Sequence, residues 1–381
     1  MPAPSPRKRR PVRNKWIGAP QLRPVKKRTP SNQSGSTHLF VFFLSVGRLV
    51  CCPGHRGVAW RGRESGVPGE TEHQMAGMPA RGRTSVLRAM HSEESSMFMN
   101  LSPGAISIRA SLPEAIRLAS AHGFGGVDIS IAEAAQIASQ SSVDAVRELF
   151  ATAGVRPGGW GLPVNWRGNE TEYQQGLSNL GRLAALGQAI GATRVTQWIP
   201  SASDERAFYE NFHFHVARFQ PIARILADHG CRLALEFIGP QTQRNGKKYG
   251  FIHTMDGMLA LCAAIGPNVG LLLDSWHWYT SHSTLAELDH VTNDQIVYVH
   301  VNDAPAGVAI DDQIDNVRCL PGETGVIDLP GFLRKLEAAG YDGPVTPEPF
   351  SQRVREMPAE DAARTTATAL RGAWRAAGLR E

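Results

Sequence analysis

Hydrophobic and polar positions alternate in blocks over most of the chain. From Met97 onward, short apolar runs rich in β-branched residues alternate with longer runs in which apolar residues recur at helical spacing. This alternation of strands and amphipathic helices favours a parallel sheet with crossover helices. The predicted strands are 99–108, 125–130, 155–163, 192–199, 231–238, 269–276, 296–302 and 343–350. The predicted helices are 112–122, 131–153, 170–190, 205–229, 255–265, 284–291, 329–339 and 359–377.

Residues at the helix ends support these boundaries. Gly follows most of the predicted helices, as at Gly154 and Gly191, and Gly accepts the positive φ that often ends a helix. Eight strand–helix units in about 285 residues match the size of a (β/α)8 barrel. No glycine-rich phosphate-binding motif follows any strand, which disfavours an open nucleotide-binding sheet. The predicted fold is therefore α/β, with a (β/α)8 TIM barrel over residues 97–381.

Charge divides the chain into two unlike parts. Residues 1–96 hold 17 of the 40 Lys and Arg but 5 of the 35 acidic residues, a net charge of +12 against −7 for the rest. Residues 1–37 are rich in Pro, Lys, Arg and Ser and contain little apolar surface to bury. This composition predicts a disordered basic N-terminal extension over residues 1–96.

Three interpretations of the extension compete. A nucleic-acid-binding tail is disfavoured because aromatic residues are not interleaved with the basic ones. An export or anchoring segment is disfavoured because the basic region before the apolar run 39–52 is much longer than in a signal peptide. We favour an extension that is non-functional or not translated, with synthesis starting at an internal Met such as Met90 or Met97.

The composition also limits the partners and the compartment. A net charge of −7 after residue 96 argues against a nucleic-acid partner for the barrel. No run approaches the roughly 20 uncharged apolar residues of a membrane span, so no membrane partner is expected. The cysteines after residue 96 have no paired spacing, which indicates a reducing, cytoplasmic location.

Ligand-capable residues end the last four predicted strands. They are Glu236 in LALEF, Asp274 in LLLDSWHW, His300 in VYVHVND and Glu348 in PVTPEPF. Catalytic groups of a barrel lie at the carboxyl ends of its strands, and neighbouring strands are about 5 Å apart. Any one of these residues could be a strand-end hydrogen bonder, but four in phase favour a shared site. Three carboxylates and one imidazole suit a single divalent ion such as Mn²⁺, Mg²⁺, Co²⁺ or Zn²⁺.

These residues resemble a known family in their order along the chain. The pattern is similar to the xylose-isomerase-like TIM-barrel superfamily, in its sugar phosphate isomerase/epimerase group, over about residues 97–378. The resemblance rests on Glu236, the segments 274–277 (DSWH), 300–303 (HVND) and 318–328 (RCLPGETGVID), and Glu348.

The resemblance implies an activity and roles for these residues. It implies one divalent metal ion bound by Glu236, Asp274, His300 and Glu348. It also implies a sugar isomerase or epimerase that moves a proton next to the carbonyl of a keto sugar or sugar derivative, through a metal-bound enediolate. Glu236 and Glu348 would be the catalytic acid/base pair, and His277 and Arg318 would bind substrate oxygens. The partner is then a small sugar, and the resemblance also allows a homo-oligomer.

Two further candidates for substrate binding come from loops. Trp160 could form a wall against the face of a sugar, with packing at the top of the barrel as the alternative. Lys248, in the loop after the fifth strand, could recognise a phosphate or carboxylate, with a solvated loop as the alternative. The resemblance is incomplete in two places: the acid expected soon after Glu236 is missing, and the arginine expected soon after His300 comes only at Arg318, after the insertion 304–317.

Other functions stay open at this stage. A metal-dependent lyase of the inosose dehydratase type would use the same metal ligands. A non-catalytic sugar-binding barrel is less favoured because all four ligands are present. An abasic-site endonuclease needs additional histidines at the ends of the second and third strands, and these are absent.

Overall fold

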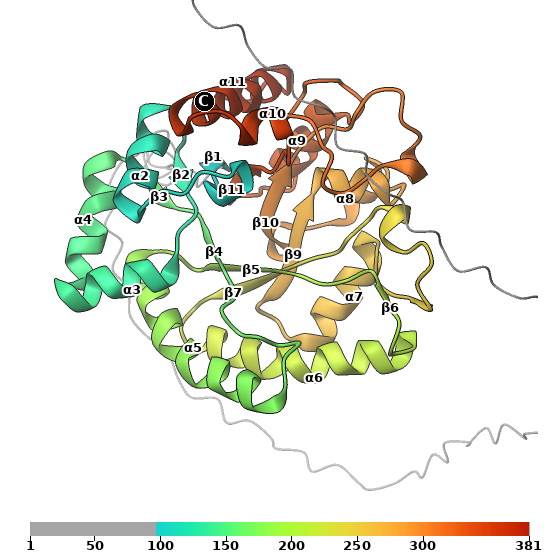
Figure 1. The fold of residues 1–381 in the computed structure, drawn as a ribbon, viewed down its shortest axis with the longest axis horizontal. Coiled ribbons are helices and arrows are strands. Elements are labelled where there is room, and N and C mark those ends of the chain that lie inside the picture. The colour runs from blue at the N-terminus through green and yellow to red at the C-terminus, as the bar shows by residue number, and fades with distance from the viewer. Residues whose placement is uncertain (1–96, 381) are drawn as a thin grey trace, which may run out of the picture. The chain divides into compact units, whose positions relative to one another are not determined.

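The computed structural model of the protein describes residues 97–380. The predicted basic extension, residues 1–96, lies outside the described residues, so its interpretation stays a prediction. Within the described part, helices surround a central set of parallel strands, and the last helix lies beside the first α-helix (Figure 1). The predicted (β/α)8 barrel is confirmed.

Nine parallel strands form one sheet in the order β3-β2-β1-β11-β10-β9-β7-β5-β4. They are β1 (Phe98–Leu101), β2 (Gly126–Val127), β3 (Arg156–Pro157), β4 (Gly159–Gly161), β5 (Arg194–Trp198), β7 (Arg232–Glu236), β9 (Val269–Asp274), β10 (Ile296–Val301) and β11 (Pro344–Pro347). The two ends of the sheet, β3 and β4, are consecutive pieces of one segment. β3 pairs with β2 and β4 pairs with β5, so this segment closes the sheet into a barrel of eight positions.

Gly158 makes this closure possible. A Cβ atom at this position would lie 2.4 Å from Asn100 Oδ1 and 2.6 Å from Asp128 Oδ1, closer than real Cβ contacts allow. Glycine therefore lets the segment turn from one neighbour to the other while two polar side chains stay inside the barrel.

Ten helices of the described residues pack around the strands. They are α2 (Leu112–Ala121), α3 (Ile131–Gln140), α4 (Val143–Ala153), α5 (Glu170–Ile190), α6 (Phe208–Ala227), α7 (Met255–Ile265), α8 (Ser275–Thr280), α9 (Leu329–Ala338), α10 (Gln352–Arg355) and α11 (Ala359–Ala376). The prediction of one helix over 131–153 is wrong, because the Ser142 hydroxyl caps a new helix by accepting the Ala145 N–H at 3.0 Å. The helix predicted at 284–291 is only a short 3₁₀ helix, Glu287–His290.

Two connections over the carboxyl ends of the strands pair with each other. β6 (Ala202–Ser203) and β8 (Tyr249–Gly250) form a two-stranded antiparallel sheet. The loop after β5 is thereby tied to the loop after β7. Both loops contribute to the mouth of the barrel.

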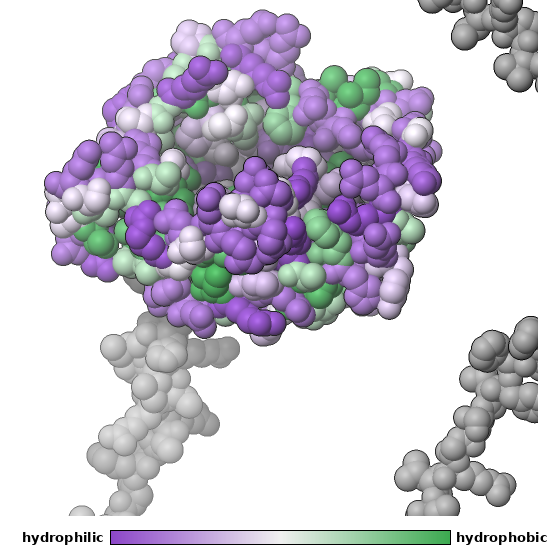
Figure 2. Space-filling view, turned by 60° about the horizontal axis from the view of Figure 1, so that its bottom comes forward, coloured by the Kyte–Doolittle hydropathy of each residue, from purple (hydrophilic) through white to green (hydrophobic). Residues whose placement is uncertain are grey.

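The surface in Figure 2 is largely hydrophilic, with small and separated apolar patches. None of the helices in residues 97–380 combines the length and the apolar character needed to cross a membrane.

His215 lies in an aromatic part of the core under α6. Its ring stacks against Phe251 at 4.8 Å between centroids and lies 5.1 Å from the Trp166 ring. The Nδ1–H donates to the Asn211 carbonyl at 2.7 Å. Burial lowers the pKa of His215 to about 4.

This buried histidine predicts sensitivity to acid. The unfolded chain binds the proton near pH 6.5, whereas the folded protein binds it only near pH 4. Stability is therefore complete above about pH 6.5 and falls as the pH drops toward 4, by about 3 kcal/mol from this residue. Urea unfolding of His215→Phe should show a smaller loss over that range, relative to each protein's own stability at pH 8. An equal loss in both proteins would contradict this assignment.

Candidate metal centre and surrounding pocket

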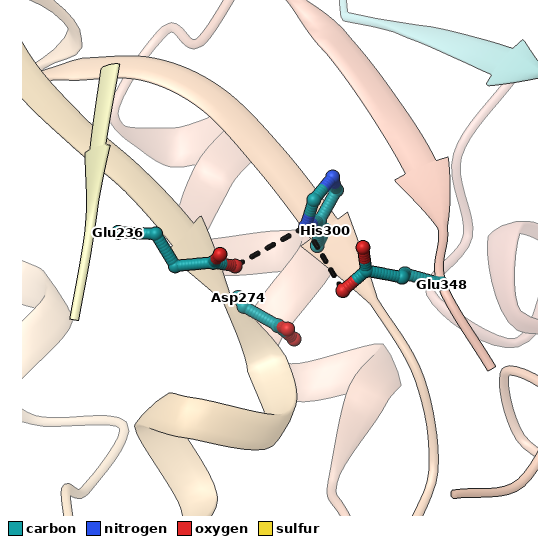
Figure 3. Close-up of side chains that lie close together, drawn as sticks. All are labelled: Glu236, Asp274, His300 and Glu348. Carbon is teal, nitrogen blue, oxygen red and sulfur yellow. Dashed lines mark hydrogen bonds and ion pairs between the residues drawn. The ribbon is translucent and has the colours of Figure 1, made fainter. Parts of the chain in front are cut away.

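Four side chains converge at the carboxyl end of the barrel (Figure 3). Glu236 and Asp274 end β7 and β9, His300 lies on β10, and Glu348 directly follows β11. Strand register brings His300 directly opposite Asp274. One ligand atom from each of the four residues lies within 4.8 Å of the others. The structure thus brings together all four residues predicted as metal ligands.

The cluster is buried and rich in negative charge. His300 Nδ1 lies 3.2 Å from Glu236 Oε1 and 3.4 Å from Glu348 Oε2. Burial raises the pKa of Glu236 to about 7, against the opposing effect of His300. Burial alone would lower the pKa of His300, but the carboxylates of Glu348, Glu236 and Asp274 together raise it to about 10. These carboxylates therefore strongly favour a positive charge at their centre.

Asn302 holds the Asp274 carboxyl group and the Glu348 backbone in place, a role that was not predicted. Its Nδ2–H donates to Asp274 Oδ1 at 2.9 Å, and its Oδ1 accepts the Glu348 backbone N–H at 2.9 Å. Asp274 Oδ1 also accepts the Trp276 N–H at 2.8 Å, which caps α8. Asp274 Oδ2 is left to face the centre of the site. The available signal was a polar residue directly after β10, two positions beyond His300.

Arg318 reaches the centre of the cluster from the long loop after β10. Its NH1 lies 2.8 Å from Asp274 Oδ2 and 3.1 Å from Glu348 Oε2, and its NH2 lies 2.7 Å from Asp315 Oδ1. Only 4% of Arg318 is exposed. A guanidinium group thus neutralises part of the acidic cluster. Asp315 was not predicted, because its loop has no periodic pattern.

Asp303 fastens that loop at its base. Its carboxylate accepts four backbone N–H groups, those of Ala304, Thr324, Gly325 and Ile327, at 2.7–3.0 Å. Its own backbone pairs with that of Cys319. Asp303 therefore braces the loop that carries Arg318.

His277 presents a polar edge to the pocket. It is almost fully buried, and burial lowers the pKa of its ring to about 4, so the ring is neutral near pH 7. The Gly239 N–H donates to Nδ1 at 3.2 Å, and Arg318 NH2 lies 3.2 Å from Nε2. A neutral imidazole accepts only one hydrogen bond in its plane. Both ring nitrogens face N–H donors, so only one of these two contacts is a hydrogen bond while the neutral ring carries its single proton.

The cluster opens into a cavity of about 550 Å³. Its lining contains Glu236, His277, Arg318 and Glu348, four residues predicted to contact substrate. Trp198, Gln243, Asn316 and Phe350 also line it and were not predicted.

The other two predicted substrate contacts lie elsewhere. Lys248 is exposed outside the cavity lining, with its ammonium 4.8 Å from the centroid of the Tyr249 ring; its neighbour Lys247 lines the cavity instead. Trp160 is 2% exposed, and its indole N–H donates to the Ala192 carbonyl at 2.8 Å. It lines a second cavity, on the side of the site nearest β1, β2 and β4.

The donor set fits a divalent cation. Three carboxylates and one imidazole supply hard oxygen ligands and a borderline nitrogen ligand, typical of Mn²⁺, Mg²⁺, Co²⁺ and Zn²⁺ sites. Each ligand comes from a strand end, and Asn302 orients the Asp274 carboxylate and holds the Glu348 backbone. The positive charge of Arg318 already offsets part of the negative charge of the cluster, and a divalent ion would offset more of it.

Curated relatives are sugar isomerases and dehydratases. The chain is 24% identical over 231 residues to the inosose isomerase of Halalkalibacterium halodurans, covering 59% of this chain and 77% of that enzyme. It is 26% identical over 268 residues to the 3-dehydroshikimate dehydratase of Pseudomonas putida, covering 68% of this chain and 39% of that longer enzyme. These similarities support the predicted enzyme class, isomerase or epimerase, and also the lyase alternative.

Solved structures share the fold. A xylose isomerase domain protein from Alicyclobacillus acidocaldarius is 30% identical, with a TM-score of 0.66 over 74% of this chain and all of that one. The IolI protein, whose structure contains a bound zinc atom, is 21% identical, with a TM-score of 0.61 over 73% of this chain and 98% of that one. The family model of the xylose isomerase-like TIM barrel matches residues 116–373. The chain therefore belongs to the xylose isomerase-like TIM barrel family.

Proposed function

We propose that the protein is a metal-dependent isomerase or epimerase of a keto sugar or sugar derivative, acting by proton transfer next to a carbonyl. The observation that carries this proposal is the placement of two glutamates on opposite sides of one buried site. Glu236 ends β7 and Glu348 directly follows β11, and the strands β9 and β10 lie between these two in the sheet. Both approach His300 Nδ1, at 3.2 and 3.4 Å. A substrate carbon between them would present a different face to each carboxyl group.

The metal ligands are Glu236, Asp274, His300 and Glu348, and Mn²⁺, Mg²⁺, Co²⁺ and Zn²⁺ are the candidate ions. A bound divalent ion supplies Lewis acidity, which polarises the substrate carbonyl and lowers the barrier to breaking the adjacent C–H bond.

The protein's own groups then move the proton. One glutamate accepts the proton from the carbon, and the other donates a proton to the opposite face, so the configuration of that carbon changes. Burial raises the pKa of Glu236 to about 7 in the metal-free site, and a bound divalent ion would lower it, which favours the carboxylate form that accepts the proton. The two carboxyl groups exchange roles for the reverse reaction.

His277 and Arg318 orient the substrate in this proposal. His277 Nε2 lies 4.0 Å from Glu236 Oε1, close enough to form a hydrogen bond with a substrate oxygen beside the reacting carbon. Arg318 can turn one N–H from its carboxylate partners toward a second oxygen. Cytoplasmic location and a homo-oligomeric state stay predictions.

A dehydratase is the second candidate, supported by the similarity to 3-dehydroshikimate dehydratase. The first step, removal of a proton next to a carbonyl, would be the same. The second glutamate would then donate its proton to a departing hydroxyl group, which leaves as water, and a C=C bond forms. A protein that only binds sugar would leave the buried glutamates without a chemical role.

Exchange of hydrogen in D₂O tests the proposal. With inosose or a ketose as substrate, the metal-loaded protein should incorporate carbon-bound deuterium without loss of mass as water, measured by NMR and mass spectrometry. A chelator should lower the exchange rate by at least about 100-fold, and one of the four candidate ions should restore it. Loss of a hydroxyl group would favour the dehydratase. Full activity after verified removal of metal would contradict the proposed site.

A further inference from the structure

A second cavity adjoins the proposed metal centre, on the side away from His277. Its volume is about 400 Å³, and His300 and Glu348 form part of its wall. The loops after β1 and β2 form its rim, with Arg109 and Glu133. Glu348 also lines the first cavity, so the two cavities meet at the cluster. A ligand held at the metal centre can therefore extend into the second cavity.

Asp128 lies in the wall of this cavity with an unusual set of partners. Its Oδ1 accepts three hydrogen bonds: from Tyr298 O–H at 2.6 Å, from Gly159 N–H at 2.8 Å and from Asn100 Nδ2–H at 2.9 Å. Tyr298 Oη in turn lies 2.6 Å from Thr346 Oγ1. These donors fix the position of the carboxyl group within the barrel.

The second carboxyl oxygen of Asp128 is free. Among residues 97–380, no group donates a hydrogen bond to Oδ2, although three donate to Oδ1. Asp128 is partly buried and lines the cavity, and Oδ2 is not one of the buried polar atoms that lack a partner, so it is open to a hydrogen bond from water or a ligand there. Tyr298 links Asp128 to the proposed metal centre. It donates a hydrogen bond to Asp128, and its ring packs edge-on against His300 at 5.4 Å between centroids.

We propose that Asp128 determines specificity, by accepting a hydrogen bond from a substrate hydroxyl group that lies beyond the metal-bound oxygens. This inference rests on the proposed function. It favours polyhydroxy ketones that place a hydroxyl group rather than a carboxylate beside Asp128, because a carboxylate there would meet a negative charge. Arg109 lines the same cavity, so only the position beside Asp128 disfavours a carboxylate. Inosose fits this class, whereas 3-dehydroshikimate carries a carboxylate.

Asp128→Asn tests the inference with little change in shape. The amide oxygen can keep the three donors to Oδ1, and its NH₂ group takes the place of Oδ2. Affinities of the metal-loaded proteins for inosose and 3-dehydroshikimate are measured from the ligand dependence of the thermal unfolding midpoint. The variant should bind inosose about 10-fold more weakly and 3-dehydroshikimate more tightly than the unchanged protein does, since a charge-assisted hydrogen bond is lost and a repulsion is removed.

Glu133→Gln is the matched control. Glu133 lines the same cavity, but its Oε1 already accepts the Leu112 N–H at 2.7 Å, so this variant should change the ratio of the two affinities much less than Asp128→Asn does. An equal ratio in Asp128→Asn and the unchanged protein, with deuterium exchange retained, would overturn the role of Asp128 alone. Failure of the unchanged protein to bind either ketone or to exchange deuterium would overturn the proposed function as well.

Discussion

Replacing Glu348 by Gln is expected to lower the rate of carbon-bound deuterium exchange by about 1,000-fold or more, and Glu236→Gln should do the same. Each substitution removes a carboxylate that is proposed to serve both as a metal ligand and as a proton acceptor. The amide is close in shape, and the strand-end backbone of Glu348 stays held by its N–H bond to Asn302 Oδ1 at 2.9 Å. Folding should therefore survive, as far-UV circular dichroism can verify.

The two roles of the glutamates can be separated with Asp274→Asn. Asp274 is a proposed ligand but has no proposed part in proton transfer. Weakened metal binding in Asp274→Asn should be overcome by excess metal, with recovery of much of the exchange, whereas Glu348→Gln should stay inactive when its metal content is restored. Recovery of Glu348→Gln by metal alone would show that Glu348 is only a ligand. Glu133→Gln, outside the cluster, serves as the control for a Glu-to-Gln change near the site.

Replacing Arg318 by Met is expected to destabilise the metal-free protein by about 3 kcal/mol or more. Arg318 is buried and its guanidinium contacts the carboxylates of Asp274, Asp315 and Glu348 at 2.7–3.1 Å. Without it, these carboxylates face one another with only the protonated His300 to offset their charge. Urea unfolding in the presence of a chelator measures the loss.

Metal should offset most of that loss. A divalent cation in the cluster would supply the positive charge that Arg318→Met removes, so the two proteins should differ much less in excess metal. Arg353→Met is the matched control: Arg353 pairs with Glu323 at 2.7 Å, but its side chain is 54% exposed, so its effect should be within about 1 kcal/mol. Equal stability of Arg318→Met and the unchanged protein in chelator would contradict a neutralising role for Arg318.

The barrel could be predicted from sequence because its signals are local. Apolar runs and helix-ending glycines mark most of the strand–helix units. Places where a single side chain ends one helix or strand and begins another were missed. The Ser142 hydroxyl divides one predicted helix into α3 and α4. Similarly, Asp274 ends β9 two residues early because its carboxylate caps α8.

The four proposed metal ligands could also be predicted from the sequence, because each stands at the end of a strand. In a barrel, the carboxyl ends of all strands meet at one end of the barrel, so the sequence alone predicts that Glu236, Asp274, His300 and Glu348 lie together. The network around Asp128 could not be predicted in this way, because Asn100 meets Tyr298 across 198 residues and Thr346 across 246. Each of these polar residues alone resembles an ordinary strand residue.

The anchoring of the loop by Asp303 has a consequence for how the site can diversify. Both ends of the insertion 304–317 are held, one by the Asp303 carboxylate and the other by the backbone pairing of Asp303 with Cys319. A loop fixed at its base can gain, lose or exchange residues at modest cost in stability. Arg318, next to the fixed Cys319, would keep its place through changes that retain Asp315, because Asp315 accepts hydrogen bonds from Arg318 at 2.7 and 2.8 Å. The insertion 304–317 is therefore suited to exchange between related proteins when a change in sugar specificity is sought.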